Sequence, residues 1–212
     1  MKSAEVGDTK GARKGTAQRQ SGRDTASKIL RTAHGLLMSG GYADFSMRNI
    51  ADKAGIRLAN LQYYYPKKED LIQALMTYVG DLYDENYALR LEQAGDSAEE
   101  RFEAALNFNL EDINKLDTRH FFIQLWPLLG MADNYTGTLL AKLYAPQLRQ
   151  LSELIADLHP DASSVDLKLR AELLSSMLEG LMVVSLTPEA NPKNLETLKK
   201  MAIRTAYQIA AG

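Results

Sequence analysis

Side chains able to hydrogen-bond to base-pair edges are concentrated in one short stretch, residues 57–64, RLANLQYY. Gln62 can form two hydrogen bonds with an adenine edge, and Leu58 and Ala59 suit contact with thymine methyl groups. Donors of the kind that hold phosphate oxygens surround these positions, namely Arg48, Arg57, Asn60, Tyr63, Tyr64 and Lys68. Together these residue types indicate contact with double-stranded DNA.

Two short helices joined by a glycine turn would position these side chains. Ser46 is suited to cap the first helix, because its hydroxyl can accept from the free amides of the first turn. Apolar residues then recur at helical spacing, at Met47, Ile50, Ala51 and Ala54. Gly55 follows where the chain must leave that helix with a positive φ. The pattern predicts a helix-turn-helix, whose second helix fits the major groove; an ordinary pair of packed helices is the alternative.

Several further motifs lie in register around this turn. They are Gly40-Gly41-Tyr42, Phe45-Ser46-Met47-Arg48-Asn49-Ile50-Ala51, Ala54-Gly55-Ile56, Leu61-Gln62-Tyr63-Tyr64-Tyr65 and Lys68-Glu69-Asp70-Leu71. With them, residues from about 25 to 75 resemble the DNA-binding domain of the TetR family of bacterial transcriptional regulators. The resemblance implies base contacts from Arg48, Leu58, Ala59 and Gln62, and phosphate contacts from Asn60, Tyr63, Tyr64 and Lys68. Arg57, Asn60 and Gln62 depart from common family residues, so we expect them to set this protein's own operator preference.

The charge distribution agrees with a DNA-contacting N-terminal part. The first 80 residues carry 13 Lys and Arg against 7 Asp and Glu, whereas the remaining 132 carry 12 against 20. A near-neutral chain therefore has a basic N-terminal third. The absence of cysteine and of any apolar run of about 20 residues excludes a disulfide framework and a membrane span, and we expect a cytoplasmic protein.

Hydrophobic periodicity predicts an all-α fold of about nine helices, with no alternating β pattern. We expect a disordered basic tail at 1–22, a three-helix helix-turn-helix domain at 23–67, and a helical bundle for effector binding and dimerisation at 68–212. Outside the helix-turn-helix, the predicted helices cover about 24–39, 68–93, 97–115, 118–131, 135–158, 165–187 and 193–211.

The segment 173–186, LLSSMLEGLMVVSL, is apolar around nearly its whole circumference. A helix of this kind must be covered on both sides, so one side is expected to meet a second subunit beside the last helix. The predicted dimer interface consists of Leu174, Leu178, Leu181, Ser185, Leu198, Ala202, Thr205 and Ile209. The alternative is that this helix is the centre of a monomeric bundle.

Large soft and aromatic side chains recur through the middle helices. The family resemblance implies a pocket here for a small effector, and such pockets are mostly apolar with a few polar groups. The predicted ligand-binding residues are Phe102, Phe108, Phe122, Trp126, Met131, Tyr144 and Met177. The alternative for each is an ordinary place in the core. We expect an apolar or amphipathic ligand.

The function predicted from the sequence is a ligand-responsive transcriptional regulator. It is expected to bind a palindromic DNA operator as a homodimer, to repress transcription, and to be released by a small hydrophobic or amphipathic effector. The alternative is an activator or a regulator that needs no ligand. A remote alternative is a helical enzyme in which Asp117 and His120 form half a metal site. No glycine-rich phosphate loop or nucleophile–base pair is recognisable, so we predict no catalytic residues, cofactor or metal.

Overall fold

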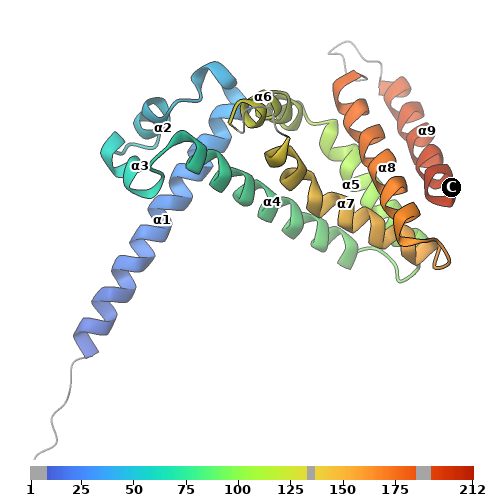
Figure 1. The fold of residues 1–212 in the computed structure, drawn as a ribbon, viewed down its shortest axis with the longest axis horizontal. Coiled ribbons are helices and arrows are strands. Elements are labelled where there is room, and N and C mark those ends of the chain that lie inside the picture. Colours follow the sequence, from blue (N-terminus) through green and yellow to red (C-terminus); the bar gives the residue numbers. More distant parts are fainter. Residues whose placement is uncertain (1–8, 133–136, 185–191) are drawn as a thin grey trace, which may run out of the picture.

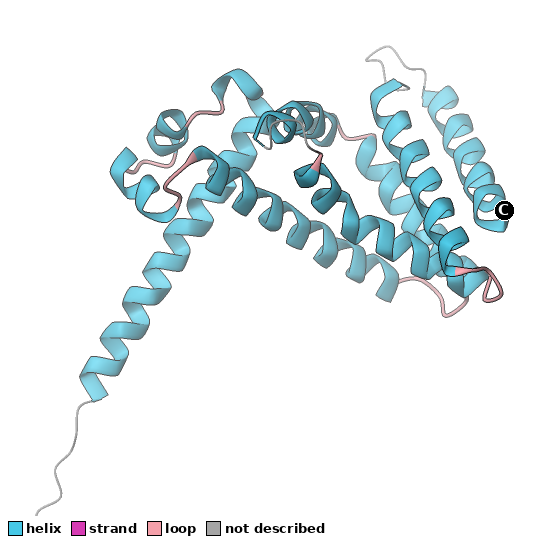
Figure 2. Ribbon diagram, viewed as in Figure 1, coloured by secondary structure: helices cyan, strands magenta, loops and turns pink. Residues whose placement is uncertain are grey.

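The computed structural model describes residues 9–132, 137–184 and 192–212, and the regular structure in these ranges is entirely helical (Figures 1 and 2). This confirms the predicted all-α class. The helices are α1 (Thr9–Ser39), the short 3-10 helix η1 (Tyr42–Asp44), α2 (Met47–Lys53), α3 (Leu58–Tyr64), α4 (Lys68–Glu92), α5 (Ala98–Ile113), α6 (Leu116–Ala132), α7 (Thr138–Leu158), α8 (Ser164–Val184) and α9 (Pro192–Ala211).

The helices form a small N-terminal domain and a larger bundle (Figure 1). Helices α1, α2 and α3 lie together at one end of the molecule, and α1 projects well beyond them. Helix α4 leaves this domain and runs along the bundle, while α8 and α9 lie side by side at the opposite end. The predicted helix positions from α4 onward agree with this arrangement to within a few residues. The predicted ends at 135 and 187 lie outside the described residues.

Helix α1 differs most from the prediction, because it begins at Thr9 and not near Asp24. Residues 9–22, which we expected to be disordered, therefore continue the helix that packs in the core. Extending an existing helix adds one hydrogen bond for each residue fixed, whereas starting one is costly, so composition alone is a poor guide to where a helix begins. Residues 1–8 of the predicted tail lie outside the described residues.

The N-terminal domain shares its core with the bundle. Ile29, Leu37, Ile50 and Leu61 are fully buried together with the first turns of α4. Helix α6 contributes four further buried residues to the same cluster, which are Phe121, Leu125, Leu128 and Leu129. The domain boundary predicted at residue 67 stays a prediction, and apolar packing is continuous across it.

A second core holds the bundle together. Phe102 and Leu106 of α5 are fully buried against α7, α8 and α9. A smaller cluster between α5, α8 and α9 contains Leu110, Leu178 and Met182. None of the helices in the described ranges is both long enough and apolar enough to cross a membrane.

Candidate DNA-binding surface and effector pocket

The turn between α2 and α3 has the hydrogen bonds that the sequence predicts. The Ser46 hydroxyl accepts from the backbone amide of Asn49 at 3.2 Å, which caps α2. At the other end, the amide of Ile56 donates to the carbonyl of Ala51, and the amide of Gly55 donates to that of Asp52, both at 3.0 Å. This pair of bonds is a Schellman motif, and it requires the positive φ of 65° found at Gly55.

Helix α3 is anchored by one buried residue and presents its other faces outward. Leu61 is fully buried between α1 and α2, and this orients the helix. Six of the nine predicted DNA-contacting side chains are exposed, namely Arg48, Arg57, Ala59, Asn60, Gln62 and Tyr63. Tyr63 is 78 % exposed, an unusual position for a large ring unless something covers it. These six side chains are therefore accessible on α2, on α3 and at the turn between them.

The other three predicted DNA-contacting residues also have structural contacts. Leu58 and Tyr64 are half-buried against the core of the N-terminal domain. The Lys68 ammonium lies over the rings of Tyr42 and Phe45, 5.3 and 5.5 Å from their centroids. Burial lowers the pKa of Lys68, and the nearby Glu69 opposes that shift. Lys68 thus stabilises the junction of α4 with the N-terminal domain, a role the sequence did not indicate.

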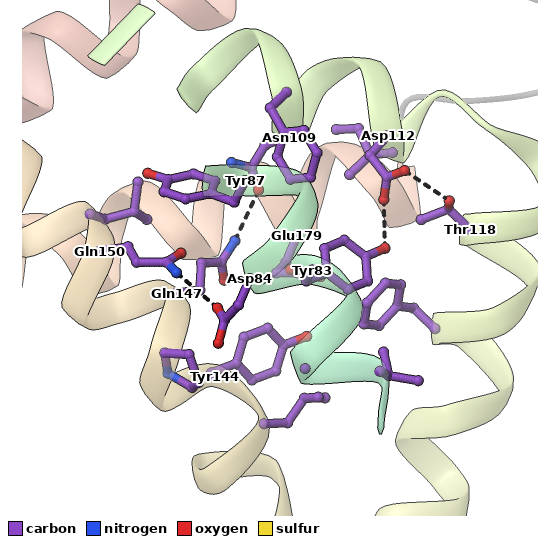
Figure 3. Close-up of a pocket in the computed structure, with 18 of the residues that line it drawn as sticks. Tyr83, Asp84, Tyr87, Asn109, Asp112, Thr118, Tyr144, Gln147, Gln150 and Glu179 are labelled. Carbon is purple, nitrogen blue, oxygen red and sulfur yellow. Dashed lines mark hydrogen bonds between the residues drawn. The ribbon is translucent and has the colours of Figure 1, made fainter. Parts of the chain in front are cut away.

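A cavity in the bundle lies between α4, α5, α6, α7 and α8 (Figure 3). Its aromatic wall consists of Tyr83, Tyr87, Phe108, Phe122 and Tyr144. Tyr83 and Tyr87 both meet the Phe108 ring edge-on, with centroids 6.3 and 5.8 Å apart. A free volume of about 100 Å³ remains between these side chains. Because ligand pockets usually have about 300–1,000 Å³, only a very small molecule fits unless the cavity wall moves.

Polar groups at the cavity are linked by hydrogen bonds that cross between helices (Figure 3). The Tyr83 hydroxyl donates to Asp112 at 2.5 Å, and Thr118 donates to the other oxygen of Asp112 at 3.3 Å. On the opposite side, the Gln150 amide donates to Asp84 at 2.9 Å. Gln147 donates to Asn109 at 3.2 Å and accepts from Ser175 at 3.0 Å. These bonds fix the polar lining before any ligand binds.

Glu179 of α8 is the least satisfied charged group at the cavity. Its Oε2 atom is buried and has no hydrogen-bond partner. Burial raises the pKa of the Glu179 carboxyl to about 7, and the hydrogen bond from Tyr144 opposes the shift only in part. The Tyr144 hydroxyl in turn accepts from the indole nitrogen of Trp126 at 2.8 Å. Glu179 therefore titrates near neutral pH, between protonated and charged forms.

Three of the seven predicted ligand-binding residues line this cavity: Phe108, Phe122 and Tyr144. Trp126 does not line the cavity, but its indole nitrogen donates a hydrogen bond to Tyr144, which does. The other three predicted residues lie away from this cavity, and their role in ligand binding stays a prediction. Phe102 is fully buried in the second core against the Tyr207 ring, and Met177 packs against that core on α8. Met131 lies at the end of α6, where its sulfur is 3.1 Å from the Tyr42 hydroxyl. Aromatic and methionine side chains fill cores and pockets alike, so residue type alone does not separate them.

Sequence reasoning missed the part of the cavity wall formed by α4. Gly80, Tyr83, Asp84 and Tyr87 all line the cavity from this helix. Their spacing of three, four and seven residues places them on one helical face. A small residue and two tyrosines on one face, beside a carboxylate, were the available signal.

Several residues of the predicted dimer interface are buried within their own subunit, and the interface itself stays a prediction. Leu174, Leu178 and Ala202 are buried inside their own subunit, while Leu181, Leu198, Thr205 and Ile209 are half-buried, and Ser185 lies outside the described residues. A helix that is apolar all round gives no sign in its sequence of which side faces inward. The exposed apolar side chains of α8 are Val165, Leu169, Leu173, Val183 and Val184, and Met201 of α9 is 50 % exposed.

Helix α6 connects the cavity to the N-terminal domain. Thr118 and Phe122 of this helix line the cavity. Two residues further on, the Gln124 side chain accepts a hydrogen bond from the backbone amide of Tyr42 at 2.8 Å. Tyr42 belongs to the segment just before the helix-turn-helix. A displacement of α6 at the cavity would therefore act directly on the N-terminal domain.

The predicted half metal site does not gain further ligands. Asp117 and His120 are both exposed on α6. Among the residues that the structure describes, no group of three or more potential metal ligands is found.

The fold and the exposed second helix of the turn define a protein of the helix-turn-helix class in which a larger helical bundle follows the DNA-binding domain. Residues 29–75 match the sequence profile of the bacterial regulatory proteins of the tetR family. The N-terminal part of the chain therefore carries the helix-turn-helix domain that is typical of TetR regulators.

Several solved structures of similar fold are those of transcriptional regulators. A TetR-family transcriptional regulator from Rhodococcus sp. is 19 % identical, with a TM-score of 0.70 over 89 % of this chain and 99 % of its own. A transcriptional regulator from Pseudomonas aeruginosa PAO1 is 19 % identical, with a TM-score of 0.68 over 88 % and 90 %. A transcriptional regulator from Saccharomonospora viridis, solved in complex with choline, is 19 % identical, with a TM-score of 0.65 over 85 % and 94 %. No curated protein matches the sequence significantly.

Proposed function

We propose that this regulator is a cytoplasmic, non-enzymatic repressor that binds a palindromic operator as a homodimer and is released by a small effector. The observation that carries the proposal is the exposed surface of α3 and its N-terminus, with Arg57, Gln62 and Tyr63 projecting from a helix anchored by Leu61. Base contacts are assigned to Arg48, Leu58, Ala59 and Gln62. Phosphate contacts are assigned to Arg57, Asn60, Tyr63, Tyr64 and Lys68.

The test of DNA recognition uses binding sites selected from randomised DNA by the purified protein. We expect a palindrome whose half-sites lie about 34–36 Å apart, one turn of DNA. Gln62→Ala should relax the preference at one base position by about 1–3 kcal/mol. Arg57→Ala should weaken binding to all DNA sequences alike, and it should reduce the slope of log affinity against log salt concentration by about one. Lys200 is an exposed lysine on α9, so Lys200→Ala is the control for the loss of one positive charge away from α3. Equal losses over all sequences in both the Gln62 and Arg57 variants would contradict the assignment of roles.

The dimer is proposed to form through the exposed apolar side chains of α8 and the neighbouring surface of α9. Leu173 lies in the middle of this surface and is 58 % exposed. Leu173→Asp should therefore give a monomer in sedimentation velocity and lose cooperative operator binding. Leu116 on α6 is equally exposed at 58 %, so Leu116→Asp is a matched control that should stay dimeric. A dimeric Leu173→Asp protein would exclude this surface.

Effector release is supported by the cavity and by its connection through α6. A ligand that prefers a different packing of the cavity wall would move α4 and α6, and with them the two α3 helices of the dimer. It can shift the equilibrium only by its difference in affinity for the two states. The Saccharomonospora protein of similar fold was solved with a small organic molecule, choline, which supports a ligand-responsive role here. Measuring operator affinity with and without small molecules tests this step.

A further inference from the structure

The cavity has an unbalanced set of charges. Three acidic residues, Asp84, Asp112 and Glu179, are among its lining residues, and no described lining residue is Lys, Arg or His. Asp112 is partly compensated, because Lys115 outside the cavity lies 3.0 Å from its Oδ1 atom. Among the contacts described above, Asp84 accepts one hydrogen bond, from the neutral side-chain amide of Gln150. The ionisable side chains that line the cavity, apart from its tyrosines, are therefore all acidic.

The same cavity contains polar atoms whose hydrogen bonds are not made within the described protein. The Oε2 atom of Glu179 is buried without a partner, and so is the hydroxyl of Tyr87, a residue only 7 % exposed. Buried groups left in this state cost free energy, so they usually mark a place where something else binds. Glu179 lines the cavity, so a partner for its oxygen would lie in the cavity interior, whereas the Tyr87 hydroxyl lies toward Arg101 and Glu153, which are not lining residues.

Aromatic rings complete the arrangement around Glu179. Tyr83 from α4 and Tyr144 from α7 approach the Glu179 carboxyl from α8 in the same part of the cavity (Figure 3). Phe108 and Phe122 extend the ring surface beside Tyr83. Ring faces attract cations, and the attraction grows when the site is desolvated. A carboxylate with a free oxygen among tyrosine rings is suited to a diffuse positive charge with apolar substituents.

We propose that the effector of this cavity is a small organic cation, whose charged nitrogen lies against Glu179 and the rings of Tyr83 and Tyr144. This narrows the apolar or amphipathic ligand expected from the sequence to one charge class, and it rests on the proposed effector function of the cavity. An anion is disfavoured by the three carboxylates. A neutral apolar ligand would leave the Glu179 oxygen unsatisfied.

The proposal has a consequence for pH. A bound cation favours the charged carboxylate, so binding must displace the proton that Glu179 carries at lower pH. The other titratable groups facing Glu179 are Tyr83 and Tyr144, whose pKa values burial raises, so both stay neutral near pH 7. Asp112 lies further along the same wall, with Lys115 beside it. With a Glu179 pKa of about 7, the charged fraction, and with it the affinity, should rise about tenfold between pH 6 and pH 8.

The experiment is calorimetric titration of the full-length protein with three probes that differ in charge. The cation is benzyltrimethylammonium, the neutral compound is benzyl alcohol, and the anion is benzoate. We expect the cation to bind at least tenfold more tightly than either of the others, with affinity rising from pH 6 to pH 8. Glu179→Gln should weaken the cation at pH 8 by about tenfold and abolish the pH dependence. Glu103→Gln, an exposed carboxyl on α5, removes the same charge away from the cavity and should change neither.

A second variant tests the location independently of Glu179. Gly80 lines the cavity, and a Cβ added there meets no atom within 4 Å, so the side chain of Gly80→Leu should enter the free space and block every probe. Tighter binding of benzyl alcohol or benzoate, no binding of the cation, or an unchanged affinity in Glu179→Gln would each overturn the proposal. Measuring operator binding distinguishes failure of this proposal from failure of the proposed function. If a neutral probe binds in the cavity and releases DNA, control by an effector is retained and only the proposal of a cationic ligand is refuted.

Discussion

The glycine turn of the helix-turn-helix allows a prediction whose size follows from backbone conformation alone. Gly55 has a φ of 65°, and a Cβ added there would meet only the Nζ atom of Lys28, at 4.0 Å. The cost of Gly55→Ala is therefore conformational and not steric. The left-handed region costs an alanine about 1–2 kcal/mol, and the reduced freedom of the unfolded chain returns about 0.4–1 kcal/mol. The net destabilisation should be about 1 kcal/mol.

Gly35 gives a matched substitution with the opposite sign. It lies in α1 with a helical backbone, and a Cβ there meets nothing within 4 Å. Gly35→Ala should stabilise the protein by about 0.5–1 kcal/mol, because alanine loses less conformational freedom in a helix. The two variants add the same methyl group to the same domain, so the difference between them isolates the turn.

The assay is urea unfolding followed by far-UV circular dichroism, at one protein concentration because dimerisation would contribute to stability. Operator binding at low temperature should be weakened in Gly55→Ala, since strain in the turn changes the orientation of α3, and unchanged in Gly35→Ala. If Gly55→Ala equals or exceeds the wild type in stability, or if Gly35→Ala unfolds at lower urea, the reasoning from backbone conformation is refuted.

Four further predictions concern single side chains. Ser46→Ala should lower the free energy of unfolding by about 1 kcal/mol through loss of the α2 cap, and Leu61→Ala by about 2–5 kcal/mol through loss of the α3 anchor, both measurable by urea unfolding. Gln124→Ala removes the acceptor for the Tyr42 amide, so it should reduce the effect of a bound ligand on operator affinity by several-fold while the free protein still binds DNA; an undiminished effect would exclude α6 as the connection. Because Glu179 has a raised pKa, the folded state binds its proton more tightly, so stability should fall from pH 5 to pH 8 by up to about 3 kcal/mol, and Glu179→Gln should flatten this curve.

Local chemistry made the N-terminal domain predictable. Ser46 and Gly55 act within a few residues of themselves, one by accepting an amide hydrogen bond and the other by adopting a positive φ. The start of α1 was less predictable, because a helix supported by tertiary packing can extend into a sequence that would not form one alone.

The helices of the bundle were predictable from the sequence, but which of their faces are buried and which are exposed was much less so. Leu174 and Leu173 are neighbours in an apolar helix, yet the first is fully buried and the second is 58 % exposed. Their sequence context is the same, so only the position of α7 and α9 against α8 separates them. Phe102 and Phe108 on α5 differ in the same way, since one fills the second core and the other lines the cavity.

The sequence by itself determined the class of protein, the helices, the turn and the side chains exposed on α3, because each depends on residues close together in the chain. Only the tertiary structure decided the phase of α8, the contact of α6 with Tyr42, and the meeting of Tyr83, Tyr144 and Glu179 at one cavity. Those features depend on which faces of distant helices pack together, and that choice minimises exposed apolar surface over the whole molecule.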